Sequence, residues 1–373
     1  MKSTSATRVV VDLNAYANNL RIIRQMIPGE CAVLAVVKAD AYGHGGVRIA
    51  RKALTEGVSM LGVATVDEGI TLRDAGVDAP ILVMVQPPAE AIGVAVENDL
   101  RIMVSDVATA EHIGEHARRL NKVVPIHCKI DSGMGRQGFD IETALNDITF
   151  LTRVSHIDIE GIATHFPLAE TVRDQFTATQ LKLFKHLLKQ LEKQGIPYEM
   201  AHAANSAAII NYPNSVLDMV RPGLMTYGVW PTETPPVQSP LHPVLRWETR
   251  IMLIKDIRPG TAIGYGRTYT VHEPMRMALL PVGYADGYKY KLANNADVII
   301  RGKRCPVRGA VSMDQITVDV TGVPGAVVGD TATLIGTDGS QHISADELAQ
   351  RAQTIPYDIL TGIGPRCERV FVE

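Results

Sequence analysis

A lysine stands where an uninterrupted apolar segment ends. Residues 32–37 are all apolar, Lys38 follows them directly, and a glycine-rich turn comes next at 43–46. An apolar run of this kind is typical of a strand that is buried on both faces. At the end of such a strand an ammonium group is partly desolvated, which lowers its pKa and leaves a nucleophilic amine able to condense with an aldehyde. The alternative is that Lys38 only extends its charged end into solvent.

A second segment combines a strand end with residues that bind anions. HAANSAA (202–208) predicts a strand that stops at a helix N-terminus, where Asn205 and Ser206 offer polar donors to an anion such as a phosphate. The same two side chains can cap the helix instead. Capping does not exclude anion binding, because both use the same donors.

A third segment carries a basic side chain within a glycine pattern. GMGRQG (133–138) contains Arg136 and satisfies G-x-G-x-x-G, so a dinucleotide-binding domain has to be considered. Lys129 and Asp131 occupy the predicted strand end before the glycines, and about 130 residues precede a motif that normally opens its domain. Both observations count against a dinucleotide, and this motif alone is a weak signal.

These residues need a scaffold that brings strand ends together. After a first apolar segment at 9–13, eight short apolar runs follow, and most gaps between them hold amphipathic, helix-like sequence. Such alternation predicts a parallel sheet, and eight strands predict a (β/α)8 barrel, with an open doubly wound sheet as the alternative. In a barrel, side chains at the C-terminal strand ends face the active site. The predicted strands are 32–38, 60–65, 81–86, 101–105, 124–130, 160–166, 200–204 and 219–228.

A change of composition marks a second domain. Five prolines lie within 231–243, a density that blocks helix and central strand, so we expect a linker there. Beyond it, short β-rich runs separated by Gly, Pro and Asp predict a mostly antiparallel β domain with one helix, whose N-cap is Ser344. We therefore expect a barrel domain at 8–236 and a β domain at 237–373, to which residues 1–7 can add.

Composition excludes several classes of protein. The formal net charge of −3 over 373 residues offers no basic face for nucleic acid or an anionic membrane. No apolar stretch approaches the roughly 18 residues that span a bilayer, and the N-terminal segment has too short an apolar run for a secretory signal. The four cysteines are scattered without a CxxC pair, which favours reduced thiols in the cytoplasm over a disulfide framework or a zinc site. We expect no metal ion.

The segment AVVKADAYGHG around Lys38 resembles the pyridoxal-phosphate (PLP) lysine motif of the alanine racemases. Eight further segments resemble blocks of the same family in the same order. They are KIDSGMGRQG, THF, HAANSAA, RPGLMTYG, GYGRTY, VGYADGY, SMDQ and TIPYDILTGI. The similarity extends from about residue 7 to the C-terminus, so the chain is identified as a member of this family by resemblance.

The resemblance implies two catalytic bases. Lys38 would hold PLP as a Schiff base and act as one base, and Tyr265 of the opposite subunit would be the other. PLP is an electron sink that makes the Cα–H of an amino acid removable as a proton. A free tyrosine has a pKa of about 10, so Tyr265 needs neighbours that tune it, for which the resemblance offers His165 and Arg221.

The resemblance also assigns the remaining site residues. Arg221 would face the pyridine nitrogen and, because arginine keeps its proton, would leave that nitrogen unprotonated, which favours racemisation over transamination. Arg136 would bind the substrate carboxylate, and Lys129 can be carbamylated to give Arg136 an anionic partner. Met313 and Asp314 would join the substrate site from the opposite subunit. The cofactor would also be bound by Tyr42, His165, Asn205, Ser206, the amides of Gly223 and Leu224, and Tyr357.

The implied activity is interconversion of L- and D-alanine by a cytoplasmic homodimer with shared active sites, supplying D-alanine for cell-wall peptidoglycan. Alternatives on the same scaffold are a serine or broad-spectrum racemase, a PLP decarboxylase, and a PLP-binding barrel without catalysis. The sequence departs from the family at Lys289 and Tyr290, where Pro-Arg is usual, and at Ala310, where arginine is common. These departures leave substrate breadth and subunit affinity open.

Overall fold

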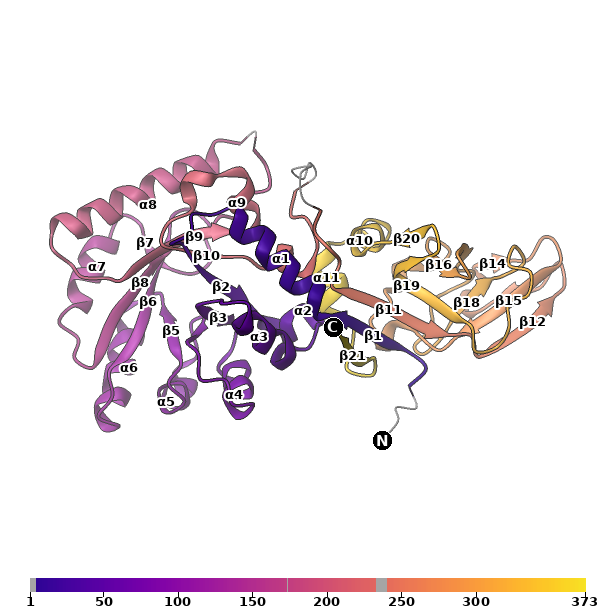
Figure 1. Ribbon diagram of the computed structural model, residues 1–373, viewed down its shortest axis with the longest axis horizontal. Helices are drawn as coiled ribbons and strands as arrows, with labels where there is room; N and C mark the ends of the chain where they lie inside the picture. The colour runs from indigo at the N-terminus through magenta and orange to yellow at the C-terminus, as the bar shows by residue number, and fades with distance from the viewer. Residues whose placement is uncertain (1–4, 173, 233–239) are drawn as a thin grey trace. The chain divides into compact units, whose positions relative to one another are not determined.

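The computed structural model describes residues 5–172, 174–232 and 240–373, and the chain folds into two compact units. The barrel unit comprises Ala17–Ala41 and Gly46–Leu241, and the β unit comprises Met1–Tyr16, Tyr42–Gly45 and His242–Glu373. The predicted domain boundary at 236/237 and most of the predicted linker lie outside the described residues. Figure 1 shows the barrel unit mainly in purple to pink and the β unit mainly in orange to yellow.

The barrel unit is a closed parallel sheet, which confirms the predicted (β/α)8 barrel. Its strands pair in the order β5-β4-β3-β2-β10-β9-β8-β6, and β6 pairs with β5 to close the ring. The short strand β7 (Phe139–Asp140) adds to β6 outside the ring. The eight ring strands are β2 (Ala32–Val36), β3 (Met60–Val63), β4 (Ile81–Val83), β5 (Arg101–Val104), β6 (Val124–Asp131), β8 (Ile157–Ala163), β9 (Met200–Asn205) and β10 (Met219–Arg221).

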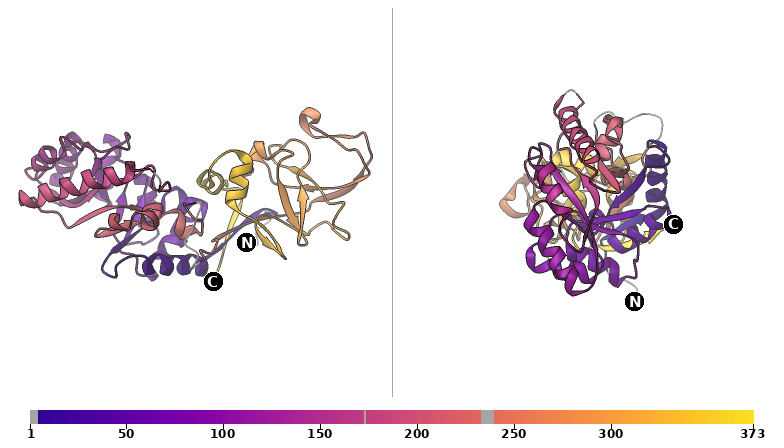
Figure 2. Two further views of the ribbon diagram at one scale, coloured as in Figure 1. Left: turned by 90° about the horizontal axis from the view of Figure 1, so that it is seen from above. Right: turned by 90° about the vertical axis from the view of Figure 1, so that its left-hand side faces the viewer.

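Helices occupy the connections between these strands, and Figures 1 and 2 show them around the sheet. Amphipathic sequence explains their placement, because each buries an apolar face: in α8 the buried residues include Leu181, Phe184 and Leu188. The helices are α1 (Leu13–Gln25), α3 (Gly46–Thr55), α4 (Val66–Asp74), α5 (Ala89–Glu97), α6 (Val107–Arg119), α7 (Ala144–Leu151), α8 (Phe176–Lys193) and α9 (Ser206–Asn211).

Several strands are shorter than the apolar runs that predicted them. The run at 219–228 forms strand only to Arg221, because Pro222 has no N–H for the ladder, and a 3₁₀ helix, η2 (Leu224–Tyr227), follows. The run at 32–38 forms strand only to Val36, and Lys38 starts the short helix α2 (Lys38–Gly43). An apolar run indicates which residues are buried. Because burial continues past the last hydrogen bond between strands, the run is longer than the strand.

The β unit is mostly β structure, as predicted. β1 (Arg8–Asp12) pairs in parallel with β21 (Glu368–Val372) and antiparallel with β11 (Leu245–Arg250) in a seven-stranded sheet. The sheet is completed by β16 (Asp297–Ile300), β17 (Lys303–Pro306), β19 (Thr331–Asp338) and β20 (Gln341–Ile343). A second sheet contains β12 (Leu253–Ile257), β15 (Met275–Leu280) and β18 (Ile316–Asp319), and a hairpin contains β13 (Ala262–Ile263) and β14 (Tyr269–Thr270).

The expected helix of the β unit is α10 (Ala345–Ala352), and Ser344 caps it by accepting a hydrogen bond from the N–H of Glu347. A second helix, α11 (Pro356–Thr361), was not expected, because TIPYDILT has too few turns to show a helical period. Within the described residues, no helix is long and apolar enough to cross a membrane.

Candidate active site at the barrel mouth

Lys38 lies where β2 gives way to α2, at the C-terminal edge of the barrel sheet. The φ angles of residues 39–42 are +51 to +54°, so this helical turn is left-handed. L-residues pay about 1–2 kcal/mol each for that conformation, and side-chain acceptors help to hold it. Glu68 accepts a hydrogen bond from the N–H of Ala39 at 2.6 Å, and Asp40 accepts one from the N–H of Gly46 at 2.6 Å.

The amine of Lys38 is a weaker base than an ordinary lysine. Burial and the positive charge of Arg136 lower its pKa, while Glu68 partly opposes them. A larger fraction of neutral amine is therefore present near neutral pH than in a free lysine, which is what nucleophilic attack requires.

Arg221 ends β10 and is buried. Its Nη1 contacts Nδ1 of His202 at 2.7 Å, and its Nη2 donates to the carbonyl oxygens of Thr164 at 2.7 Å and Ala203 at 3.1 Å. Nη2 also contacts Nδ1 of His165 at 3.3 Å. These partners are neutral, and burial lowers the pKa of Arg221 to about 10.

Basic groups surround Arg221 at the same edge of the barrel. Lys129, on β6, is buried, and burial followed by the charges of Arg221 and Arg136 holds its pKa well below the usual value. Burial and then Lys129, Arg221, Arg136 and Lys38 hold the pKa of His165 well below its usual value. The structure thus brings together these five predicted site residues, and their combined positive potential suits an anionic ligand.

The loop that carries Arg136 is organised by one carboxylate. Asp131 Oδ1 accepts hydrogen bonds from the N–H groups of Gly133, Met134 and Gly135 at 2.7–3.1 Å, and Oδ2 accepts one from Arg136 N–H at 3.0 Å. Burial opposes the charge on Asp131, but the four hydrogen bonds outweigh it and lower the pKa. A dinucleotide phosphate would need these amides, which already donate to Asp131, so the glycine pattern does not form a dinucleotide-binding loop.

The predicted anion-binding segment forms the expected strand end and helix start. Asn205 caps α9 by accepting from Ala208 N–H at 3.0 Å and donates to the carbonyl of Phe166 at 3.2 Å, so its side chain is committed to structure. Ser206 Oγ accepts from the N–H of Gly223 at 2.9 Å. That bond ties the end of β9 to the turn before η2 and places Leu224 at the start of this 3₁₀ helix.

Two predicted cofactor residues lie in the β unit. The rings of Tyr42 and Tyr357 are tilted against each other with centroids 5.8 Å apart. Tyr42 is buried, and burial followed by the nearby Tyr357 raises its pKa, whereas Tyr357 is partly exposed. Arg369 fixes the segment that carries Tyr42 by donating to the carbonyl of Gly43 at 3.1 Å.

Other predicted residues lie on exposed loops of the β unit. Tyr265 is 75% exposed in the turn between β13 and β14, and Met313 is 53% exposed. Asp314 accepts a hydrogen bond from Arg366 at 2.9 Å. Among the described contacts within each unit, none joins these three residues to another predicted site residue. Their roles therefore stay predictions.

The two sequence departures have structural contexts in the same unit. Lys289 forms an ion pair with Asp358 at 3.0 Å, and Tyr290 is exposed. Ala310 is buried, and its backbone lies within van der Waals distance of a Cβ built on Gly264, next to the predicted base.

Sequence reasoning missed Glu68, which holds the turn after Lys38. The signal was present: Thr65 and Glu68 match the S/T-x-x-E capping box, which the structure contains at the start of α4. The spacing predicts a helix start, but it does not reveal that Glu68 also reaches the backbone of another loop.

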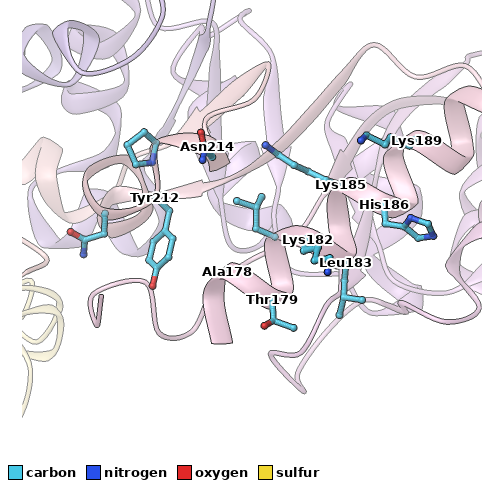
Figure 3. A pocket seen from close by; sticks show the side chains of 12 residues that line it. Ala178, Thr179, Lys182, Leu183, Lys185, His186, Lys189, Tyr212 and Asn214 are labelled. Carbon is cyan, nitrogen blue, oxygen red and sulfur yellow. The ribbon is translucent and has the colours of Figure 1, made fainter. Parts of the chain in front are cut away.

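A separate cavity of about 790 Å³ lies on the outside of the barrel unit, beside α8 (Figure 3). Lys182, Lys185, His186 and Lys189 come from the helix, and Tyr212 comes from the segment after α9. None of the predicted site residues lines this cavity.

Comparisons with known proteins cover nearly the whole chain. Residues 11–231 match the family model for the N-terminal domain of alanine racemase, and residues 244–371 match that for its C-terminal domain. The chain is similar to alanine racemase 2 of Caldanaerobacter subterraneus subsp. tengcongensis, with 39% identity over 367 residues that cover 98% of this chain and 95% of that protein.

Two solved structures extend the comparison. Alanine racemase from Clostridium difficile 630 superposes with a TM-score of 0.95 at 35% identity, covering 100% of this chain and 97% of that one. Alanine racemase from Bartonella henselae with covalently bound pyridoxal phosphate gives a TM-score of 0.88 at 27% identity, covering 99% and 100% of the two chains.

Proposed function

Since the chain belongs to the alanine racemase family, as its sequence predicted, we propose that it is a PLP-dependent isomerase that interconverts L-alanine and D-alanine. The strongest support is the amine of Lys38, whose pKa is lowered at the mouth of a barrel among Lys129, Arg136 and Arg221. The alternative is a serine or broad-spectrum racemase, because the departures at Lys289, Tyr290 and Ala310 lie in the β unit, to which the family resemblance assigns the substrate entrance.

The donor set at the barrel mouth fits PLP. The cofactor has an aldehyde, a phosphate and a ring nitrogen, and this edge of the barrel offers a nucleophilic amine, a cationic surrounding and a buried guanidinium. Within the described residues, Nε of Arg221 donates no hydrogen bond, so it remains available to an acceptor. When bound, PLP withdraws electrons from Cα and makes the proton there removable.

Two side chains would move that proton. We assign the Nζ of Lys38 to covalent attachment of the cofactor and to proton transfer on one face of Cα, and the Oη of Tyr265 of the opposite subunit to the other face. A racemase needs a base on each face, because a single base would return the proton to the side from which it took it. The lowered pKa of Lys38 suits it to proton transfer near neutral pH.

Arg221 would control the fate of the reaction. As a donor-only group, it leaves the ring nitrogen as an acceptor, which limits electron withdrawal and favours return of the proton to Cα. The phosphate would be bound by Tyr42, Ser206, the amides of Gly223 and Leu224, and Tyr357, with Asn205 at the N-terminus of α9 beside it and His165 also near the cofactor. The commitment of Asn205 to capping supports a positioning role for it over direct contact.

Arg136 would bind the substrate carboxylate, with Met313 and Asp314 of the opposite subunit completing the site. Lys129 would be carbamylated, because burial and the neighbouring cations lower the pKa of its amine, so that its neutral form, which reacts with carbon dioxide, is more populated than in an ordinary lysine. Among the described residues, neither Arg136 nor Arg221 forms an ion pair with a carboxylate. The carbamate would supply an anionic partner for them. A mass increase confined to Lys129 or extra electron density on its amine tests this, and a plain amine in a high-resolution map of crystals kept in bicarbonate would contradict it.

A homodimer with shared active sites is supported by exposed apolar side chains on three adjoining loops. Tyr265, Tyr284 and Met313 are 75%, 45% and 53% exposed. Their loops are neighbours, because Tyr284 N–H donates to the carbonyl of Ser312 and the turn before Tyr265 packs on Ala310. A second copy would cover this surface, and the product D-alanine would serve cell-wall peptidoglycan synthesis in the cytoplasm.

The decisive experiment measures exchange of the Cα proton with solvent deuterium, by NMR, for alanine, serine, lysine and glutamate. We expect rapid exchange and racemisation for alanine only; faster exchange with serine would favour the alternative. Lys38→Ala should be colourless unless PLP is added, and it should be nearly inactive even with added PLP, because it lacks one base. Tyr265→Ala should bind PLP yet lose most racemisation, more severely from L-alanine, and unchanged rates in both directions would remove Tyr265 from the mechanism.

A further inference from the structure

Behind Arg221, hydrogen bonds connect buried side chains in a line through the barrel. Arg221 Nη1 contacts His202 Nδ1 at 2.7 Å, and His202 Nε2 contacts His127 Nδ1 at 2.8 Å. His127 Nε2 contacts Glu160 Oε2 at 2.8 Å, and Arg101 Nε donates to the same carboxylate oxygen at 2.7 Å. Both histidines are fully buried. The line joins the strands β10, β9, β6, β8 and β5.

The two ends of this line fix every proton within it. An arginine only donates, so Nδ1 of His202 has to accept and its proton sits on Nε2. That proton is donated to Nδ1 of His127, whose own proton therefore sits on Nε2 and is donated to Glu160. The carboxylate accepts from both sides. Each imidazole is neutral and has one permitted tautomer.

Burial and packing support this arrangement. Burial lowers the pKa of both His127 and His202, which keeps them neutral. Burial opposes ionisation of Glu160, but the hydrogen bonds from His127 and Arg101 outweigh it and lower its pKa to about 2. Gly161 makes room for the line, because a Cβ there would overlap the ring of His127.

The line cannot carry a proton to the active site. Transfer of a proton from Glu160 along the line would require both imidazoles to change tautomer. Nδ1 of His202 would then carry a proton and lie against the N–H of Arg221, which keeps its own proton. The same rule makes the line rigid, because any rotation or added proton places two donors against each other. It therefore acts as a clamp on the guanidinium.

We propose that His202, His127 and Glu160 are positioning residues that fix the guanidinium edge of Arg221 and thereby decide whether the proton returns to Cα. The inference rests on the proposed function, in which Arg221 faces the ring nitrogen of PLP. A loosened Arg221 would let that nitrogen acquire a proton from elsewhere. With PLP bound, the proton would then add at the former aldehyde carbon of the cofactor more often than at Cα. Water would hydrolyse the C=N bond to the substrate and release pyruvate, while the amino group would stay on the cofactor.

The first test does not depend on activity and uses variants only to assign signals. ¹⁵N NMR of histidine-labelled holoenzyme should show two imidazoles that are protonated only at Nε2 and do not titrate between about pH 5 and 8, where an ordinary histidine changes charge. Assignment uses the loss of each signal in His202→Gln and His127→Gln. Titration of either ring in that interval, or a proton on Nδ1, would overturn the proposal.

The second test measures pyruvate released per alanine racemised. His202→Leu removes both hydrogen-bonding atoms and should raise this ratio about tenfold or more, in line with the roughly 10- to 100-fold effects of removing outer hydrogen-bond partners at metal sites. His202→Gln keeps an acceptor and a donor and should restore most of the wild-type ratio. Glu160→Gln removes the charge that fixes the tautomers and should raise the ratio even if His202→Leu does not fold.

Glu248→Gln is the matched control, because Glu248 is also a buried carboxylate paired with arginine, but in the β unit. It should lower thermal stability without changing the ratio or the imidazole signals. Equal ratios in Glu160→Gln and Glu248→Gln would refute the positioning role. Failure of the wild-type enzyme to bind PLP or racemise alanine would instead refute the proposed function.

Discussion

Lys129 is a cation buried beside cations. Its pKa is lowered by burial and by Arg221 and Arg136, so the unfolded chain binds its proton more tightly than the folded chain does. Below the lowered folded pKa, both states carry the proton and the full destabilisation is present. As the pH rises from that value toward the unfolded pKa of about 10.4, stability increases, and above it the destabilisation is gone.

We therefore expect Lys129→Met to stabilise the apoprotein at neutral pH by about 1–4 kcal/mol, by analogy with the gain seen when buried ion pairs are replaced by well-packed apolar residues. Urea unfolding of apoprotein in degassed buffer checks this, and the gain should shrink toward high pH. Lys182→Met, an exposed change on α8, is the control and should have little effect. In bicarbonate buffer, carbamylation should stabilise the wild type but not Lys129→Met. A destabilised Lys129→Met in degassed buffer would contradict the account.

At the scale of elements, the left-handed turn after β2 depends on its last glycine. Gly43 has φ +78°, and an added Cβ would overlap the carbonyl oxygen of Leu360. Gly76 has nearly the same φ, +77°, but nothing lies within 4 Å of an added Cβ. Comparing substitutions at these two glycines therefore distinguishes the cost of backbone strain from the cost of close packing.

We expect Gly76→Ala to cost about 1–2 kcal/mol, the penalty of a left-handed L-residue, and Gly43→Ala to cost clearly more, because Leu360 has to move as well. Thermal unfolding of the two variants measures the difference. Gly43→Ala should also weaken PLP binding, measured by titration of the apoprotein, because the turn joins Lys38 to Tyr42. Equal stability of the two variants would show that the packing against Leu360 is unimportant.

The elements themselves could largely be predicted from the sequence, and their connections could not. Apolar runs report burial on both faces, so all eight barrel strands and the position of Lys38 at a strand end were predictable, whereas the end of the last strand at Arg221 was not. The left-handed turn was not, because Ala39–Tyr42 contains no glycine to signal positive φ. The clamp on Arg221 was not either, because it joins residues on five strands that only the closed barrel makes neighbours.

At the scale of the whole molecule, the two predicted bases of each site come from different subunits. Two inactive variants, each lacking one base, should therefore complement each other in a mixed dimer. The β unit exposes Tyr265 on a loop beside other exposed apolar residues, as an interface would require. Lys38→Ala and Tyr265→Ala homodimers should each be nearly inactive. A dimer with one subunit of each kind would contain one site with both bases intact and one site with neither.

Mixing equal amounts of the two inactive variants, with time for subunit exchange, should therefore restore activity. Random exchange makes half of the dimers mixed, and each has one intact site of two, so we expect about a quarter of wild-type activity. Racemisation assayed after dilution, incubation and reconcentration with PLP measures it. Each variant treated alone is the control, because self-exchange creates no intact site. No recovery, despite mixed dimers seen by native mass spectrometry, would mean that each subunit supplies both of its own bases.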